Sequence, residues 1–173
     1  MTGYERVRRA IHFERPDRIP FWWNDEPCDM TTDIGRSESA TFEPLPDDEL
    51  HRLVPGFSGS LFQTEWGNVR GKLASDLSTV ETVRSAIQSW DELDGFRFPD
   101  LDAPERYETA RARMAASSPE LYRLAWFGSF YFGTLYNIKK MEDLLLDLGL
   151  YRDELTAFCT KLEPIFFGCL EQW

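Results

Sequence analysis

The sequence predicts an α/β fold in which strands alternate with helices and lie parallel in a sheet. Patterns typical of the two element types follow one another in the order helix, strand, long excursion, helix, strand, helix, helix. Two runs, 19–23 and 121–127, are apolar enough for strands buried in a parallel sheet. The chain is 42% hydrophobic and 28% charged, which is typical of a globular protein rather than a disordered one.

The N-terminal region is expected to begin with a helix and to continue into a strand. Thr2 and Glu5 have the spacing of a capping box, which predicts a helix over residues 3–13. A proline-containing turn ends this helix, and the apolar, aromatic run 19–23 is typical of a strand. Residues 24–41 are polar and rich in Asp, Ser and Thr, so we expect a loop there.

The middle of the chain is expected to hold a short helix and two strands. Residues 47–53 fit a short helix, and the segments 62–73 and 78–83 fit two short strands that a hairpin would join. Ser89 and Glu92 again have the spacing of a capping box, which predicts a brief helical turn.

Three helices and a strand are expected in the remainder of the chain. A helix is predicted over 102–117 because Pro104 stands near its start, and a strand follows at 121–127. Apolar residues at helical spacing predict a helix over 140–148. A last helix follows, and Pro164 is expected to kink it.

Charge and composition argue against several functional classes. The net charge is −11, from 19 basic and 30 acidic residues, whereas nucleic acids and anionic membrane surfaces require clustered Lys and Arg. No apolar run approaches the ~18 residues of a membrane span, and the N-terminus lacks the apolar core of a signal peptide. Three cysteines without a CxxC spacing indicate a reduced, cytoplasmic protein. Two histidines argue against a zinc site complete within the chain.

Residues 5–20, E-R-V-R-R-A-I-H-F-E-R-P-D-R-I-P, carry the most specific motif of the chain. This segment resembles the start of the uroporphyrinogen decarboxylase (URO-D) superfamily, where an E-R-V helix leads through a P-D-R-[IV]-P turn into the first strand. Later segments resemble the corrinoid methyltransferase-like branch of that superfamily. These segments are E-W-G at 65–67, W-D-E-L at 90–93, F-P-D at 98–100, P-E-R-Y at 104–107 and M-E-D-L-L-L-D at 141–147.

The resemblance implies a (β/α)8 barrel, or TIM barrel, of which residues 1–173 would be the N-terminal part of a single domain. Such a barrel usually takes about 250 residues. Only two strands of this chain look like buried parallel ones, and the chain stops at Trp173 inside an apolar helical pattern. We therefore expect a truncated, incomplete barrel with little or no activity of its own.

The resemblance also places a candidate site after the first strand, because barrel enzymes have their active sites at the C-terminal ends of strands. True uroporphyrinogen decarboxylases carry two arginines here that bind the carboxylates of the substrate, whereas this chain has Asp25 and Asp29. Two aspartates would repel a polyanion, which favours the methyltransferase-like branch. Asp25 and Asp29 are thus catalytic candidates, with Asn24 and Glu26 as substrate-binding candidates; a solvated loop is the alternative.

A second set of candidates lies at the end of the predicted strand 121–127. Residues 126–133 read W-F-G-S-F-Y-F-G, in which glycines let the backbone approach a ligand and rings could stack on a flat macrocycle. Phe127, Ser129 and Tyr131 are therefore substrate-binding candidates. Aromatic packing is the alternative interpretation.

By resemblance, the expected function is that of the corrinoid- or cobalamin-dependent methyltransferase-like branch. A complete member would use a corrinoid and in some cases a zinc-activated thiolate, but no metal ligand is assigned within this chain. The expected partner is a corrinoid protein or a complementary half-barrel from a second polypeptide. The alternatives are a uroporphyrinogen decarboxylase of porphyrin biosynthesis and a non-catalytic module that binds a tetrapyrrole or a corrinoid protein.

Overall fold

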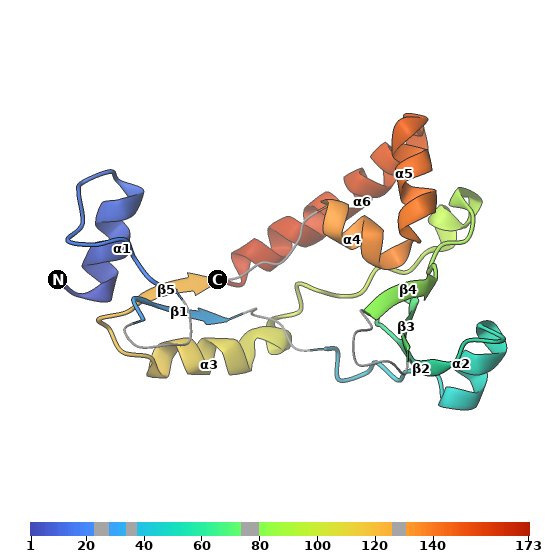
Figure 1. The fold of residues 1–173 in the computed structure, drawn as a ribbon, viewed down its shortest axis with the longest axis horizontal. Coiled ribbons are helices and arrows are strands. Elements are labelled where there is room, and N and C mark those ends of the chain that lie inside the picture. The colour runs from blue at the N-terminus through green and yellow to red at the C-terminus, as the bar shows by residue number, and fades with distance from the viewer. Residues whose placement is uncertain (23–27, 34–37, 74–79, 126–130) are drawn as a thin grey trace. The chain divides into compact units, whose positions relative to one another are not determined.

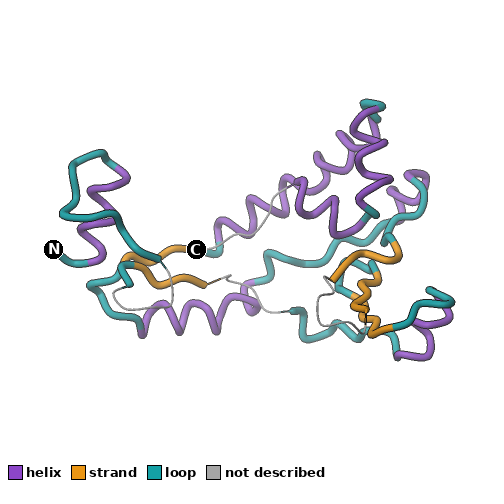
Figure 2. Tube along the Cα trace, viewed as in Figure 1, coloured by secondary structure: helices purple, strands orange, loops and turns teal. Residues whose placement is uncertain are grey.

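The computed structural model describes residues 1–22, 28–33, 38–73, 80–125 and 131–173, which are traced in Figures 1 and 2. The chain divides into two compact units. The first unit comprises Met1–Ser37, Ala103–Gly128 and Gln172–Trp173, and the second comprises Glu38–Asp102 and Ser129–Glu171.

Helix α1 (Gly3–Ile11) begins at the expected capping box. The Thr2 hydroxyl accepts a hydrogen bond from the Glu5 N–H (3.1 Å), and the Glu5 carboxylate accepts one from the Thr2 N–H (3.2 Å). These bonds satisfy N–H groups that have no partner within the helix. After the helix, Phe13 and Arg15 adopt left-handed backbone conformations, with φ of 58° and 52°.

Strands β1 (Met30–Asp33) and β5 (Tyr122–Ala125) form a parallel pair in the first unit. In the view of Figure 1, α1 lies above the pair and α3 (Glu108–Ala116) below it, and each helix contacts the strands. A short 3-10 helix, η2 (Pro104–Tyr107), leads into α3. The helix predicted over 102–117 is therefore two elements, the first more tightly wound.

The first strand lies later in the chain than predicted. Residues 19–22 form no strand, and the prediction over 19–23 was wrong for these described positions. The side chain of Ile19 is 86% exposed, and the Phe21 N–H donates to the Asp29 carboxylate (2.8 Å) instead of to a neighbouring strand. β1 instead comes from the segment 24–41 that was expected to be a loop, because apolar composition alone does not separate a strand from an exposed turn.

The second unit contains an antiparallel sheet of β2 (Gly59–Gln63), β3 (Val69–Leu73) and β4 (Val80–Arg84), in that order. The single strand predicted over 62–73 is therefore a hairpin, and the strand predicted over 78–83 overlaps β4.

Gly67 explains the division of the predicted strand. Its φ is 87°, a conformation that costs glycine little, and its N–H donates to the Thr64 carbonyl (2.8 Å). The resulting turn brings β2 and β3 together within one short stretch of chain.

Helix α2 (Asp47–Leu53) covers this sheet and has the predicted bounds. Its Leu50 packs in a core with Leu61 of β2 and Val69 of β3. Each of the three side chains is at most 7% exposed. Burial of apolar area at about 25 cal/mol per Å² is the main term that holds α2 on the sheet.

Four helical elements complete the second unit: η1 (Trp90–Gly95), α4 (Tyr131–Ile138), α5 (Met141–Gly149) and α6 (Asp153–Glu171). Helices are confirmed where α5 and α6 were predicted, whereas α4 was not predicted, and the kink at Pro164 of α6 stays a prediction. Phe158 of α6 is fully buried, and the rings of Trp90, Phe96 and Phe98 surround it at centroid distances of 6.2, 6.3 and 5.3 Å. Within the described ranges, no helix has both the length and the apolarity that crossing a bilayer requires.

The expected incomplete (β/α)8 TIM barrel was wrong. The described residues form a mixed α/β structure with one two-stranded parallel sheet and one three-stranded antiparallel sheet, and no barrel. The physical reason lies in the connections. Tight turns such as that at Gly67 join antiparallel neighbours, whereas the parallel strands of a barrel need long crossover connections.

Replacing Phe158 by Ala should lower the free energy of unfolding by about 3–5 kcal/mol, because it removes the ring at the centre of the aromatic cluster. The matched control is Phe167→Ala in the same helix, where the side chain is 59% exposed. We expect a change within about 0.5 kcal/mol there. Urea denaturation followed by circular dichroism measures both, and equal losses would contradict the assignment of this core.

Candidate functional site

Most of the predicted site residues lie outside the described residues. These are Asn24, Asp25 and Glu26 in the segment 23–27, and Phe127 and Ser129 in the segment 126–130. The structure therefore places two of the candidates, Asp29 and Tyr131.

Tyr131 is the first residue of α4 and packs against α6. Its ring meets that of Phe166 edge to face, with centroids 5.8 Å apart, and the side chain is 38% exposed. Desolvation, together with the charges of Glu163 and Cys159, raises the pKa of the Tyr131 phenol. The hydroxyl therefore keeps its proton at neutral pH and can serve as a hydrogen-bond donor.

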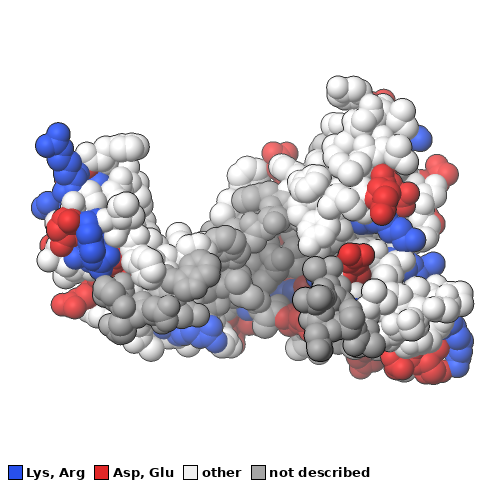
Figure 3. Space-filling model, viewed as in Figure 1, with Lys and Arg blue, Asp and Glu red and all other residues white. Residues whose placement is uncertain are grey.

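Asp29 lies immediately before β1, is 2% exposed, and accepts hydrogen bonds from two of the five arginines of the opening motif, Arg6 and Arg18. Arg6 of α1 donates to Asp29 Oδ1, and Arg18 donates to both carboxylate oxygens at 2.6 and 3.0 Å. Arg6 also forms a bidentate pair with Asp17, at 2.6 and 2.9 Å. We call Arg6, Asp17, Arg18 and Asp29 the N-terminal ion cluster. Figure 3 shows basic and acidic side chains next to one another at the α1 end of the chain.

The charges of the N-terminal ion cluster stabilise one another. The hydrogen bonds that Arg6 donates to the Asp17 carboxylate lower the pKa of Asp17 and raise the pKa of Arg6. Burial alone would raise the pKa of Asp29, but hydrogen bonds from Arg18, the Phe21 N–H and Arg6 outweigh burial and lower it. Asp29 thus stays ionised, and its oxygens are already occupied by donors from the chain.

A glycine allows α1 to approach this cluster. A Cβ added at Gly3 would lie 2.6 Å from the Asp29 carbonyl oxygen, closer than real Cβ atoms come. The Asp29 carbonyl also accepts from the Tyr122 N–H of β5 (2.9 Å). Asp29 therefore contacts α1 and β5 through its backbone and the two arginines through its side chain.

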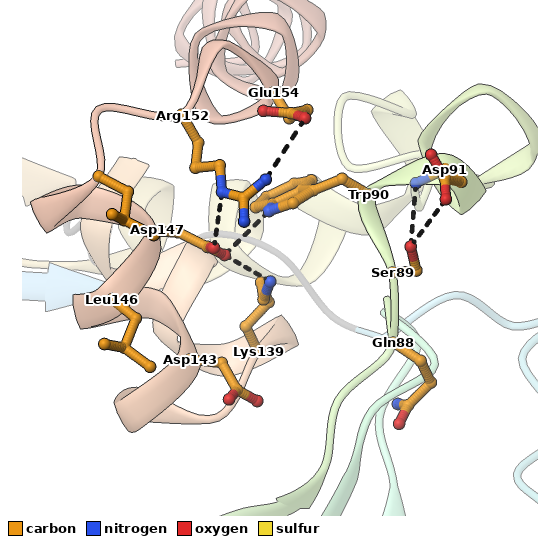
Figure 4. Close-up of a pocket in the computed structure, with 11 residues that line it drawn as sticks. Gln88, Ser89, Trp90, Asp91, Lys139, Asp143, Leu146, Asp147, Arg152 and Glu154 are labelled. Atoms are coloured by element: carbon orange, nitrogen blue, oxygen red, sulfur yellow. Dashed lines mark hydrogen bonds and ion pairs between the residues drawn. The ribbon is translucent and has the colours of Figure 1, made fainter.

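The candidate site with a cavity lies in the second unit and is formed by residues 88–91 at the start of η1, by Lys139 and α5, and by residues 150–154 at the start of α6 (Figure 4). The cavity has a volume of about 440 Å³. It is lined by Gln88, Ser89, Trp90, Asp91, Lys139, Asp143, Leu146, Asp147, Leu150, Arg152 and Glu154. We call it the Asp147 pocket.

Asp147 of α5 is the centre of this pocket, and three side chains point toward its carboxylate in Figure 4. Lys139 Nζ donates to Oδ2 at 2.6 Å and Trp90 Nε1 donates to the same oxygen at 2.9 Å. Arg152 Nε lies 3.7 Å from Oδ1. The Lys139 ammonium also lies 4.3 Å from the centre of the Trp90 ring, within the range of a cation–π contact.

The Asp147 carboxylate is held in its ionised form. Burial would raise its pKa, but the hydrogen bonds from Lys139 and Trp90 and the charges of Lys139 and Arg152 together lower it. A carboxylate in this state is a poor proton acceptor at neutral pH, so Asp147 positions its neighbours rather than acting as a general base. Among the charged side chains that line the pocket, those of Asp91, Asp143, Arg152 and Glu154 are exposed or half-exposed and therefore face solvent.

Sequence reasoning did not select any residue of this pocket as functional. Trp90 and Asp147 both lie in segments that carried the resemblance, W-D-E-L and M-E-D-L-L-L-D, but they are 57 residues apart. The available signal was an aspartate in the otherwise apolar second half of the α5 pattern, where an ionised group requires a partner. The sequence does not indicate which partner that is.

No family model matches the chain, and neither a curated protein nor a solved structure is significantly similar to it. The function must therefore be inferred from the residues themselves.

Removing the Asp147 carboxylate should be costly because it leaves the Lys139 ammonium buried without its partner. We expect Asp147→Ala to lower the free energy of unfolding by roughly 3 kcal/mol. The exposed Asp143→Ala in the same helix should change it by less than about 0.5 kcal/mol. Replacing both partners, with Lys139→Met and Asp147→Leu, should recover most of the loss. Urea denaturation tests all three variants, and a double variant no more stable than Asp147→Ala would contradict the pairing.

The lowered pKa values of Asp29 and Asp147 predict a stability that falls in acid. Their contribution is complete above the unfolded-state pKa of about 3.9 and is lost as the pH falls through the lower folded-state values. We expect a constant free energy of unfolding from about pH 7 to 5 and a decline below about pH 4. The decline should be shallower in Asp29→Asn and unchanged in Asp48→Asn, whose side chain is 64% exposed. Identical slopes in all three proteins would exclude Asp29 as a source.

Proposed function

We propose that this chain is a cytoplasmic protein of the uroporphyrinogen decarboxylase superfamily, on its corrinoid methyltransferase-like side. In this proposal a methylated corrinoid, carried by a partner protein, is the methyl donor, and a thiol or a similar nucleophile is the acceptor. The proposal rests on the sequence motifs and on the chemistry of the described residues, and it does not include a barrel.

One observation carries the proposal: residues of the segments that resemble the superfamily make specific hydrogen bonds that are buried or partly buried. Arg6, Asp17 and Arg18 of the opening motif belong to one ion cluster around Asp29. Trp90 and Asp147, from two further motif segments, share a hydrogen bond of 2.9 Å. If the resemblance were only a chance similarity of composition, we would expect these motif residues to lie scattered over the surface. They instead have specific hydrogen-bonding partners.

Charge supports the methyltransferase-like side over decarboxylation of uroporphyrinogen. That substrate is a polyanion and needs arginines free to bind carboxylates. Arg6 and Arg18 are already bound to Asp17 and Asp29. The lining of the Asp147 pocket has two cationic and four acidic side chains, an excess that repels a polyanion.

The zinc that some members of this branch use does not fit the residues that the structure describes. Within those ranges, no group of three or more His, Cys, Asp or Glu side chains could hold a metal ion. The cysteines are free, and burial raises the pKa of the Cys159 thiol, opposite to the change that an activated thiolate requires. We therefore derive no step through zinc.

Absorbance titrations with hydroxocobalamin and with uroporphyrin test the proposal. We expect the corrinoid spectrum to change on binding, while the porphyrin spectrum stays constant because its carboxylates are repelled. Transfer itself is followed anaerobically with methylcobalamin and dithiothreitol. The thiolate sulfur forms a bond to the methyl carbon, and the cobalt–carbon bond breaks with its electron pair left on cobalt, so that cob(I)alamin appears.

Other outcomes would favour other functions. Binding of uroporphyrin without binding of cobalamin would overturn the proposal in favour of a decarboxylase-like role. Binding of cobalamin without methyl transfer, tested with several thiols, would indicate a non-catalytic binding module. A chain that binds neither compound would remove the corrinoid from the proposal altogether.

A further inference from the structure

A second cavity, in the first unit, has a lining of a different kind. It has a volume of about 370 Å³ and is formed by α3, β5 and residues 172–173. This volume is at the small end of the roughly 300–1,000 Å³ typical of ligand pockets. We propose that the cavity binds a small aromatic carboxylate. This inference is independent of the function proposed above.

The charge of the lining is the first argument. Arg111 of α3 and Arg123 of β5 both line the cavity, and no acidic side chain is among the described residues that do so. The chain as a whole has 30 acidic and 19 basic residues, so two basic and no acidic side chains among the described lining residues are contrary to the average composition. Such a lining attracts an anion.

Arg123 is available to a ligand. Its side chain is exposed, and its guanidinium group has neither a hydrogen bond nor an ion pair with any residue in the described part of the chain. A guanidinium group can donate two parallel hydrogen bonds to one carboxylate, which provides both affinity and orientation.

Arg111 is held in place at the wall of the same cavity. It donates to the carbonyl oxygens of Pro104 (3.2 Å) and Gln172 (3.0 Å) and to the side-chain oxygen of Gln172 (2.6 Å). All these acceptors are uncharged, so they fix the guanidinium without neutralising it. Its positive charge therefore remains at the wall of the cavity, where it can attract an anionic ligand.

The rest of the lining is apolar and includes an aromatic ring. Trp173 is 41% exposed, and its ring meets that of the buried Tyr107 edge to face at 6.1 Å. Met114 contributes a thioether side chain that is 7% exposed. A flat ring can stack on the indole and contact the sulfur while its carboxylate reaches the arginines. The combination therefore suits an aromatic acid better than a sugar or an aliphatic anion.

Isothermal titration calorimetry with 1-naphthoate tests the proposal. We expect a Kd of roughly 1 mM or tighter, the range for a ligand of this size. The uncharged 1-naphthamide should bind at least about tenfold more weakly, because it lacks the charge that pairs with guanidinium. Affinity for naphthoate should also fall as ionic strength rises.

Variants locate the site. Arg123→Gln should weaken naphthoate binding at least about tenfold, and Arg123→Lys should weaken it less because the charge remains. The matched control is Arg9→Gln, which removes an exposed arginine of α1 outside the lining and should leave the Kd unchanged. Circular dichroism establishes that each variant is folded, so a loss of binding is not a loss of structure.

Three results would overturn the assignment. They are absence of naphthoate binding, equal affinity for the amide, and equal affinity in Arg123→Gln. If Arg9→Gln weakened binding as much as Arg123→Gln, the attraction would be a general effect of charge and the site would also be rejected.

Discussion

A carboxylate removed from water has to be surrounded by positive charge and N–H donors, and Asp29 obtains both from separate parts of the chain. Arg6 comes from α1, Arg18 from the turn after it, and the Phe21 N–H from the segment that leads to β1. The backbone of Asp29 also accepts a hydrogen bond from Tyr122 of β5. The path from the first helix to the parallel pair therefore depends on polar bonds, while apolar side chains in the same stretch, such as Ile19, stay exposed.

The second unit follows the same rule with a different carboxylate. Asp147 is buried in α5, and its Oδ2 atom accepts hydrogen bonds from Lys139, which follows α4, and from Trp90 of η1. Trp90 also touches Phe158, so the polar centre and the aromatic core are in contact through one side chain. Because a buried charge without its partner costs several kcal/mol, these two aspartates constrain the structure about as strongly as a large apolar side chain of the core does.

Local signals predicted local structure, and pairing between distant segments was not predictable. The capping box at Thr2 and Glu5 predicted α1, and the apolar spacing around Leu144 predicted α5, because both are decided within a few residues. The choice between one long strand and a hairpin depended on the backbone of Gly67, and the choice between a barrel and two sheets depended on which strands pair. Asp29 was predicted as a catalytic candidate from its position in the sequence. Its partner Arg6 is 23 residues away, and only the structure reveals that the two side chains pair.

Local charge, rather than the net charge of −11, has to decide which ligands suit this protein. Charges farther than about 8 Å away are largely screened at physiological ionic strength, so the side chains of a cavity set its potential. The lining of the Asp147 pocket carries an excess of acidic side chains, whereas the charged side chains among the described residues that line the other cavity are the basic Arg111 and Arg123. Two cavities whose lining side chains have net charges of opposite sign cannot both follow from the average composition of one acidic chain. A ligand of either cavity would therefore carry the opposite charge, positive in the Asp147 pocket and negative in the cavity of Arg111 and Arg123, and the two can be tested separately.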